Sequence, residues 1–250
     1  MTDSTWLAKL TGDSLTLQCL QGMFSDQELL LKNESGDWFL QAKEFQDCRD
    51  SGEVYETARE LLVLLNGVAA LYCNAGPIGL CSVRMKHVDG HLSSTVFGQI
   101  RARMGVQVFL KATVIGADGQ EILEPVHASR AIMRAASQDV RIHKLLEYLS
   151  QESQNYASLY KIYELICGGF ATVEAFHKWV TERNLSSVSD LRRFAETANN
   201  FYLAGDEARH ANIDKIPSGN PGMSVAESKE IIFGIARAWL EYVSPSLQNT

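Results

Sequence analysis

The sequence predicts an α+β protein, with an N-terminal antiparallel sheet and one main helix, followed by a C-terminal all-α helical bundle. Two observations support this fold class. Up to about Pro125, most apolar residues recur with the two-residue period of a half-buried strand. Beyond Pro125, they recur at spacings of three and four, which is the period of an amphipathic helix. We therefore expect two domains, a sheet domain at residues 1–125 and a helical bundle at residues 126–250.

Short segments in which apolar and polar residues alternate make up the expected sheet. The dipeptide Asp89-Gly90 predicts a hairpin between two of them, because glycine tolerates the positive φ of a type I′ turn. Asp118-Gly119 predicts a second turn on the same grounds. The segments expected to be strands are residues 15–19, 28–32, 38–42, 78–88, 92–103, 106–114 and 120–123.

One helix is expected to interrupt these strands. Its apolar residues, from Val54 to Tyr72, recur at spacings of three and four and form a single face. The segment at residues 74–77 ends in Pro77 and is expected to terminate the helix.

The second half of the chain is expected to consist of helices that pack as antiparallel neighbours, because the connections between them are short. Side-chain hydroxyl groups are expected to cap the starts of three of these helices. The expected caps are Thr172, Ser187 with Asp190, and Ser224 with Glu227. The expected helices are residues 142–149, 159–170, 173–180, 188–201 and 225–243.

The composition excludes several classes of protein. Apolar residues make up 46% and charged residues 21%, which is typical of a globular chain. A net charge of −7 disfavours a general nucleic-acid coat, since phosphate binding requires clustered Lys and Arg. The sequence contains neither a signal peptide nor an apolar run of about 18 residues, so no membrane association is expected.

The five cysteines form no C-x-x-C pair. An odd number without such a pair argues against a disulfide framework and against a structural zinc site. We therefore expect buried thiols in a reduced, cytoplasmic protein.

The most distinctive local feature is Arg209 next to His210, where one helix is expected to end. In a functional interpretation, His210 acts as an acid or base, or Arg209 binds phosphate. In the favoured structural interpretation, Arg209 satisfies carbonyl groups or a carboxylate, and His210 packs beneath the loop. Adjacent helical residues point about 100° apart, so both face one ligand only if the helix ends there.

Glu164 is the third candidate residue. It lies in a helical segment with few exposed positions, and a carboxylate inside a bundle requires a partner. Arg209 is the expected partner. The alternative places Glu164 on the outer face, paired with Lys161 or with water.

Searches for known motifs indicate no cofactor. The chain has no P-loop for nucleotide phosphates and no G-x-S-x-G nucleophile elbow. His87 and His91 flank the Asp89-Gly90 turn and are able to approach each other across the hairpin. Two histidines alone do not make a metal site, so no metal is expected.

Several stretches of the second half resemble a group of uncharacterised bacterial cytosolic proteins. These stretches, which lie between residues 130 and 243, are residues 159–164, 194–199, 206–211, 221–224 and 239–240. The resemblance implies no particular activity. The helical order, with an Arg-His element before the last helix, is also similar to HEPN-like domains. Many of those are RNases or nucleotide-binding modules of toxin and defence systems, including defence against phage. They usually place the Arg several residues before the His, whereas Arg209 and His210 are adjacent.

We therefore expect a non-enzymatic binding or assembly module in which the Arg209-His210 element organises a partner-binding or self-association loop. Homodimers are the commonest oligomers, so a homodimer of the 27.7 kDa chain is expected. The alternative is a HEPN-like RNase or nucleotide-binding enzyme. In it, His210 is the acid-base residue, Arg209 holds phosphate and Glu164 orients one of them. RNA or a nucleotide is therefore the less favoured partner.

Overall fold

The computed structural model describes residues 5–25, 28–73, 76–87, 89, 91–97, 126–209, 219 and 221–244. An N-terminal five-stranded antiparallel sheet is followed by a mostly helical region, which confirms the predicted α+β class. The chain divides into two compact units, one of residues 1–62 and 78–131 and one of residues 63–77 and 132–249. The predicted domain boundary at residue 125 lies outside the described residues.

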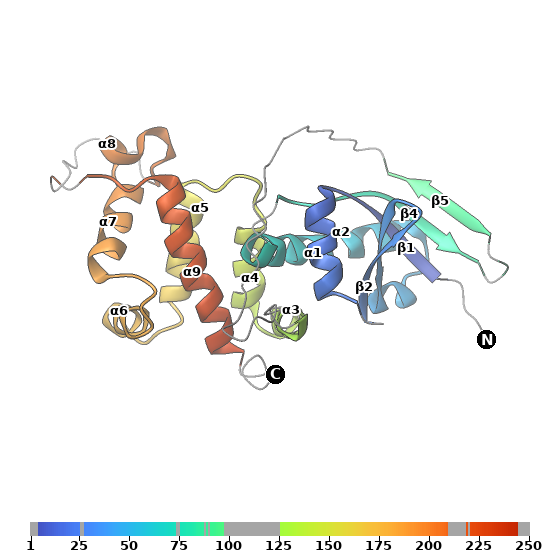
Figure 1. Ribbon diagram of the computed structural model, residues 1–250, viewed down its shortest axis with the longest axis horizontal. Helices are drawn as coiled ribbons and strands as arrows, with labels where there is room; N and C mark the ends of the chain where they lie inside the picture. The colour runs from blue at the N-terminus through green and yellow to red at the C-terminus, as the bar shows by residue number, and fades with distance from the viewer. Residues whose placement is uncertain are drawn as a thin grey trace, which may run out of the picture. The chain divides into compact units, whose positions relative to one another are not determined.

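The sheet of the first unit has the order β2-β3-β1-β4-β5, and all neighbouring strands are antiparallel. β5 is the outer strand on one side of the described sheet (Figure 1). The strands are β1 (Thr5–Thr11), β2 (Leu29–Glu34), β3 (Asp37–Ala42), β4 (Gly79–Lys86) and β5 (Leu92–Val96). Four of the predicted strands are confirmed at β2 to β5. Those predicted at residues 106–114 and 120–123 lie outside the described residues.

One predicted strand is wrong, because residues 15–19 belong to helix α1 (Ser14–Met23). The carboxylate of Asp13 caps this helix and accepts a hydrogen bond from the Thr16 N–H at 3.0 Å. Leu17 and Leu20, three positions apart, are buried on one face of the helix. Alternation over only five residues fits a helical face as well as a strand, and the cap together with this burial makes the segment a helix.

The predicted helix from Val54 to Tyr72 is confirmed. It forms α2 (Ser51–Val68), continued by the π-helical turn η2 (Ala69–Cys73). A short 3-10 helix, η1 (Lys43–Asp47), precedes it. Val54 and Ala58, on the expected apolar face of α2, have no exposed surface.

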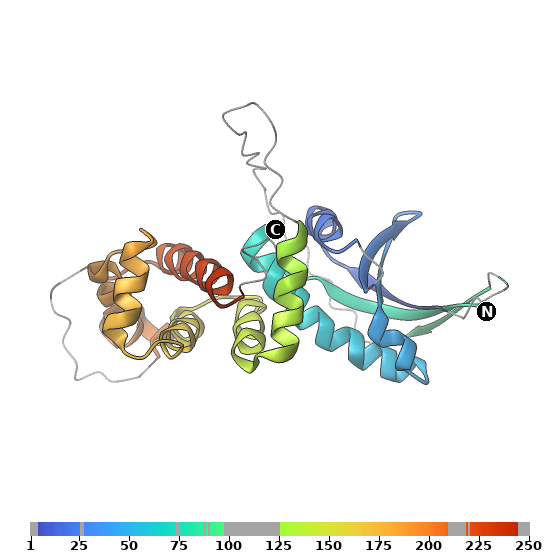
Figure 2. The ribbon, with the colours of Figure 1, turned by 90° about the horizontal axis from the view of Figure 1, so that it is seen from below.

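The helices of the remaining chain include one for each of the five predicted segments, and three further elements, at residues 126–138, 201–204 and 205–207, that had no predicted segment of their own. In chain order, the helices are α3 (Val126–Gln138), α4 (Val140–Leu149), α5 (Tyr156–Cys167), α6 (Val173–Glu182), α7 (Val188–Ala198), α8 (Phe201–Ala204), the 3-10 helix η3 (Gly205–Glu207) and α9 (Val225–Val243). Within the second unit, α5 packs against α4, α7 and α9 (Figures 1 and 2). Phe194 of α7, Ile162 of α5 and Trp239 of α9 are among the buried residues that their apolar stripes predict.

All three predicted helix caps are present. Thr172 accepts a hydrogen bond from the Ala175 N–H at 3.1 Å, and Ser187 accepts one from the Asp190 N–H at 3.0 Å. The hydroxyl of Ser224 accepts the Glu227 N–H at 3.2 Å and opens α9. Each hydroxyl satisfies a backbone donor that the first helical turn leaves unpaired.

The cysteines differ from expectation. Cys48, Cys81 and Cys167 carry free thiols, whereas Cys19 and Cys73 are disulfide-bonded. The prediction of five reduced thiols is therefore wrong for Cys19 and Cys73, because sequence spacing does not show which cysteines form disulfides. Across the ranges that the structure describes, no helix has the length and apolar character needed to cross a membrane.

Candidate functional site

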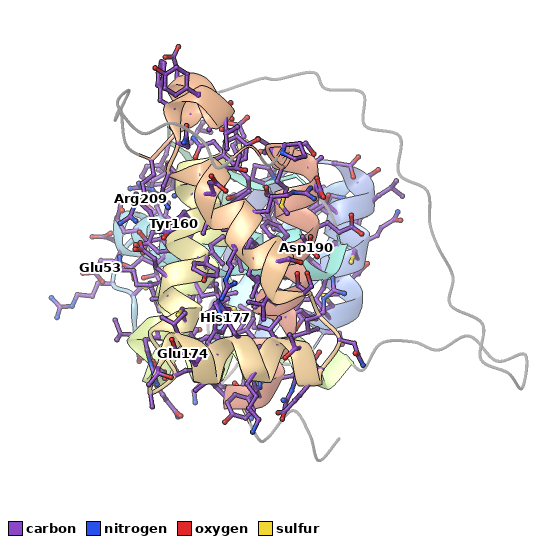
Figure 3. All side chains as sticks on the ribbon, turned by 90° about the vertical axis from the view of Figure 1, so that its left-hand side faces the viewer. Glu53, Tyr160, Glu174, His177, Asp190 and Arg209 are labelled. Carbon is purple, nitrogen blue, oxygen red and sulfur yellow. The ribbon has the colours of Figure 1, made fainter. Side chains whose placement is uncertain are left out.

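Arg209 is held by both its main chain and its side chain. Its N–H donates to the carbonyl oxygen of Ala198, the last residue of α7, at 2.7 Å. Its Nη1 lies 3.0 Å from Oε1 of Glu164, and its Cζ lies 4.6 Å from the centre of the Tyr160 ring. Figure 3 shows the Tyr160 and Arg209 side chains next to each other. These contacts fix Arg209 against α5 and α7.

The ion pair confirms the predicted partnership of Glu164 and Arg209. The pair is not buried, because the side chain of Glu164 is 45% exposed and that of Arg209 is 33% exposed. The expectation of a carboxylate inside the bundle is therefore wrong, although it led to the correct partner. Such a pair contributes about 0.2–1 kcal/mol, and the contact with the Tyr160 ring adds about 0.5–1 kcal/mol.

His210 lies outside the described residues. Of the three residues predicted for the site, the structure brings Arg209 and Glu164 together. The role of His210 stays a prediction from the sequence.

The chain that follows Arg209 is anchored again at Met223. The hydroxyl of Tyr156 donates to the Met223 carbonyl oxygen at 2.5 Å. The Met223 N–H donates to Oγ1 of Thr197 at 3.0 Å, and the Thr197 hydroxyl donates to the carbonyl oxygen of Arg193 at 2.8 Å. Tyr156, Thr197 and Met223 are all buried, so these hydrogen bonds are shielded from water.

One face of α5 therefore holds two separate points of the chain. Tyr156, Tyr160 and Glu164 follow one another at four-residue spacing, which places them on the same side of the helix. Thr197 and the carbonyl of Ala198 complete the arrangement from α7. We call these five groups the α5–α7 clamp. Its members hold Arg209 and Met223.

Sequence reasoning missed Tyr156, Tyr160 and Thr197. A usable signal was present for the two tyrosines, because they lie four and eight residues before Glu164. No comparable signal marks Thr197, since a threonine in an amphipathic helix is usual and its partner Met223 lies 26 positions away.

Electrostatics keep the Tyr156 hydroxyl available as a donor. Burial raises the pKa of the phenol above its ordinary value, and the negative charges of Glu207 and Glu227 raise it further. The hydroxyl thus stays protonated at neutral pH and can donate to the Met223 carbonyl.

The start of α9 is also tied to α7. Arg193 forms an ion pair with Glu227, in the first turn of α9, and a longer contact of 3.9 Å with Asp190. Glu227 was predicted as part of a capping box with Ser224, and its N–H does bond to Ser224. Its carboxylate pairs with Arg193 of the neighbouring helix.

A second pair of titratable groups lies between α5 and α6. Oη of Tyr163 is 3.4 Å from Nε2 of His177, and burial raises the pKa of Tyr163 to about 12. Burial also lowers the pKa of His177, and the nearby positive charge of Arg192 lowers it further, while Glu174 opposes them. Figure 3 shows His177 and Glu174 together on α6. Both members of the Tyr163–His177 pair are therefore uncharged near neutral pH.

The two histidines of the β4–β5 hairpin approach each other as the sequence suggested. The ring centres of His87 and His91 lie 5.7 Å apart, with an angle of 26° between the ring planes. Nε2 of His87 is already engaged by the hydroxyl of Ser93 at 3.0 Å. Among the residues described, no three His, Cys, Asp or Glu side chains gather in a way that could hold a metal ion.

Comparisons with protein-family models, curated proteins and solved structures found no match to this chain. Its function is therefore inferred from the geometry of its own residues.

Proposed function

We propose that the protein is a non-enzymatic binding or assembly module, in which the α5–α7 clamp holds the Arg209–Met223 segment for a partner or a second copy. The observation that carries this proposal is that the same two helices bond to both ends of the segment. Arg209 and Met223 are thereby held at fixed positions, which lowers the entropy cost of binding through these two residues.

The state of Arg209 supports a positioning role. Its guanidinium group pairs with Glu164 and covers the ring of Tyr160. A cation that already has a carboxylate partner is a weaker ligand for phosphate than a free one. In the HEPN-like alternative, the same contact serves to orient Arg209 for a phosphate. The HEPN-like alternative assigns no role to the hydrogen bonds at Met223. These bonds therefore favour a module that holds the Arg209–Met223 segment.

The decisive experiment compares partner capture by full-length variants. The tagged wild-type chain is expected to retain a partner from extracts of its own cells, and Arg209→Gln and Tyr156→Phe are each expected to lose it. Arg59→Gln is the matched control, because Arg59 pairs with Glu56 on the exposed surface of α2. Circular dichroism must show that all variants remain folded.

The outcome that favours the alternative is equally concrete. If the wild-type chain cleaves RNA, and Arg209→Ala and His210→Ala abolish cleavage without loss of helical signal, the protein is an enzyme. Substitution of Glu164 by Gln then lowers the rate as well, because it removes the group that orients Arg209.

For the cellular setting we propose the cytoplasm. The three free thiols at Cys48, Cys81 and Cys167 support it, whereas the disulfide-bonded Cys19 and Cys73 count against it. Alkylation of thiols before lysis, followed by mass spectrometry, tests this setting. Alkylated Cys19 and Cys73 would support the cytoplasm, and protection of both would contradict it.

A further inference from the structure

The pairing of β5 with β4 shows which residues of β5 direct their backbone N–H and C=O groups toward the outer edge of the sheet. The His87 N–H donates to the His91 carbonyl oxygen at 2.8 Å, in register with the Lys86–Leu92 and Met85–Ser93 pairs of β4 and β5. Hydrogen-bonded and non-hydrogen-bonded pairs alternate along an antiparallel ladder. The odd-numbered residues of β5 therefore bond to β4. Leu92, Ser94 and Val96 direct their N–H and C=O groups away from β4, toward the outer edge.

Among the described residues, this edge shows none of the features that usually block pairing. All five residues of β5 are exposed, and Leu92 and Val96 are 48% and 70% exposed. The strand contains no charged residue and no proline, and its register with β4 shows no bulge. Natural edge strands are commonly blunted by such features, so β5 is suited to pair with another strand.

The sequence of β5 is chemically symmetrical about Ser94. Leu92 and Val96 are apolar residues two positions to either side, and Ser93 and Thr95 are hydroxyl residues one position to either side. We propose that β5 pairs antiparallel with β5 of a second copy of this chain, across a two-fold axis at Ser94. The two five-stranded sheets then join through their β5 strands.

The pairing agrees with both the side chains and the backbone. It places Leu92 opposite Val96 of the second copy on one face, and Ser93 opposite Thr95 of the second copy on the other. Aliphatic pairs and Ser–Thr pairs are favourable neighbours across strands. It also makes Leu92, Ser94 and Val96 the residues of the hydrogen-bonded pairs, and these are the residues whose backbone groups face outward. If the two β5 strands were shifted by one residue relative to each other, their outward-facing backbone groups would no longer lie opposite one another.

This inference does not rest on the α5–α7 clamp. The clamp lies in the second unit and β5 in the first, so each is tested by its own variants. Loss of dimerisation in Ser94 variants leaves the clamp proposal standing, and the reverse also holds.

The first experiment measures mass by size-exclusion chromatography with light scattering. The wild-type chain is expected at about twice its 27.7 kDa mass. Ser94→Pro removes one outward N–H and none of the β4 bonds, so it is expected to give a folded monomer. Ser94→Thr keeps the N–H and is the matched control, expected to remain dimeric. A monomeric wild type, or a dimer that Ser94→Pro does not weaken, overturns the proposal. A monomeric wild type would be expected if the outer edge of β5 paired with another segment of its own chain.

The second experiment keeps the proposal falsifiable if Ser94→Pro fails to fold. On the two-fold axis, the two Ser94 Cα atoms would lie about 5.5 Å apart, which suits a disulfide. Ser94→Cys is therefore expected to form an intermolecular disulfide under mild oxidation, seen on a non-reducing gel. Ser93→Cys, whose counterpart lies diagonally at about 7–8 Å, is expected to cross-link at least tenfold less. Equal cross-linking of both variants, or none at Ser94→Cys, contradicts the two-fold register.

Discussion

Tyr156 donates its hydroxyl to the carbonyl oxygen of Met223, 67 positions later in the chain. The N–H of Met223 is bonded to Thr197, so side chains of two helices satisfy both polar backbone groups of this buried residue. Ser224, the cap of α9, follows directly. The position at which the last helix begins is therefore set by hydroxyl groups of α5 and α7.

Tyr156→Phe tests this anchor. The change keeps the ring and leaves the Met223 carbonyl without its donor, so the free energy of unfolding is expected to fall by about 1–3 kcal/mol. Urea denaturation measures the loss. Tyr202→Phe is the control, because Tyr202 is 61% exposed, and its change is expected to stay within about 0.5 kcal/mol. Equal effects of the two substitutions would show that the hydrogen bond contributes nothing.

A double-mutant cycle on Glu164→Ala and Arg209→Ala tests the ion pair of the clamp. The coupling free energy is expected to be about 0.2–1 kcal/mol and to shrink in concentrated salt, because both side chains are partly exposed. The same cycle on Lys178 and Glu182, which are more exposed and 3.7 Å apart, is expected to give coupling near zero. If the effects of the two substitutions were additive, the coupling free energy would be zero, and the ion pair would not stabilise the clamp.

Gly67 of α2 tests how closely α2 approaches α4 within the second unit. A Cβ atom at Gly67 would lie 2.5 Å from the carbonyl oxygen of Leu146, so Gly67→Ala forces backbone to move. We expect a loss of about 1–3 kcal/mol. Gly234→Ala in α9 is the matched control, since a Cβ there meets nothing within 4 Å. It is expected to stabilise the helix by about 0.5–1 kcal/mol. A neutral Gly67→Ala would be inconsistent with this close approach.

The pKa of His177 gives a test at acid pH. Burial lowers the pKa of the folded imidazole below its ordinary value of 6.5, so the unfolded chain binds the proton more tightly. The stability that neutral His177 contributes is present above about pH 6.5 and is lost as the pH falls below it. NMR titration is expected to place the His177 pKa below 6.5, and Arg192→Gln is expected to raise it. A wild-type His177 pKa above 6.5 would contradict the first expectation, and an unchanged pKa in Arg192→Gln would contradict the second.

Local signals in the sequence determined the fold class and most elements. Helix caps and apolar stripes act within a few residues, and this is why Thr172, Ser187 and Ser224 could be assigned to helix starts. The same locality explains the one wrong strand, because five alternating residues around Leu17 carry too little information to separate the two periods. The pairing of Glu164 with Arg209 was also predicted, but on the premise of a buried carboxylate, and the exposure of Glu164 shows that this premise does not hold.

Only the tertiary structure decided what surrounds that pair. The favoured interpretation of the sequence placed Glu164 inside the bundle and the alternative placed it on the outer face. The packing of α5 leaves it partly exposed, beside Tyr160 and paired with Arg209. The sequence contains no sign that the hydroxyl groups of Tyr156 and Thr197 both form hydrogen bonds to the backbone of Met223. Such contacts join residues far apart in the chain, and they depend on how the helices pack rather than on any local pattern. The sequence by itself thus determined most of the helices and strands and one partnership, although strand β1 and helix α3 were not predicted and α1 was predicted as a strand. The packing of the helices added the contacts that join this partnership to the second anchor at Met223.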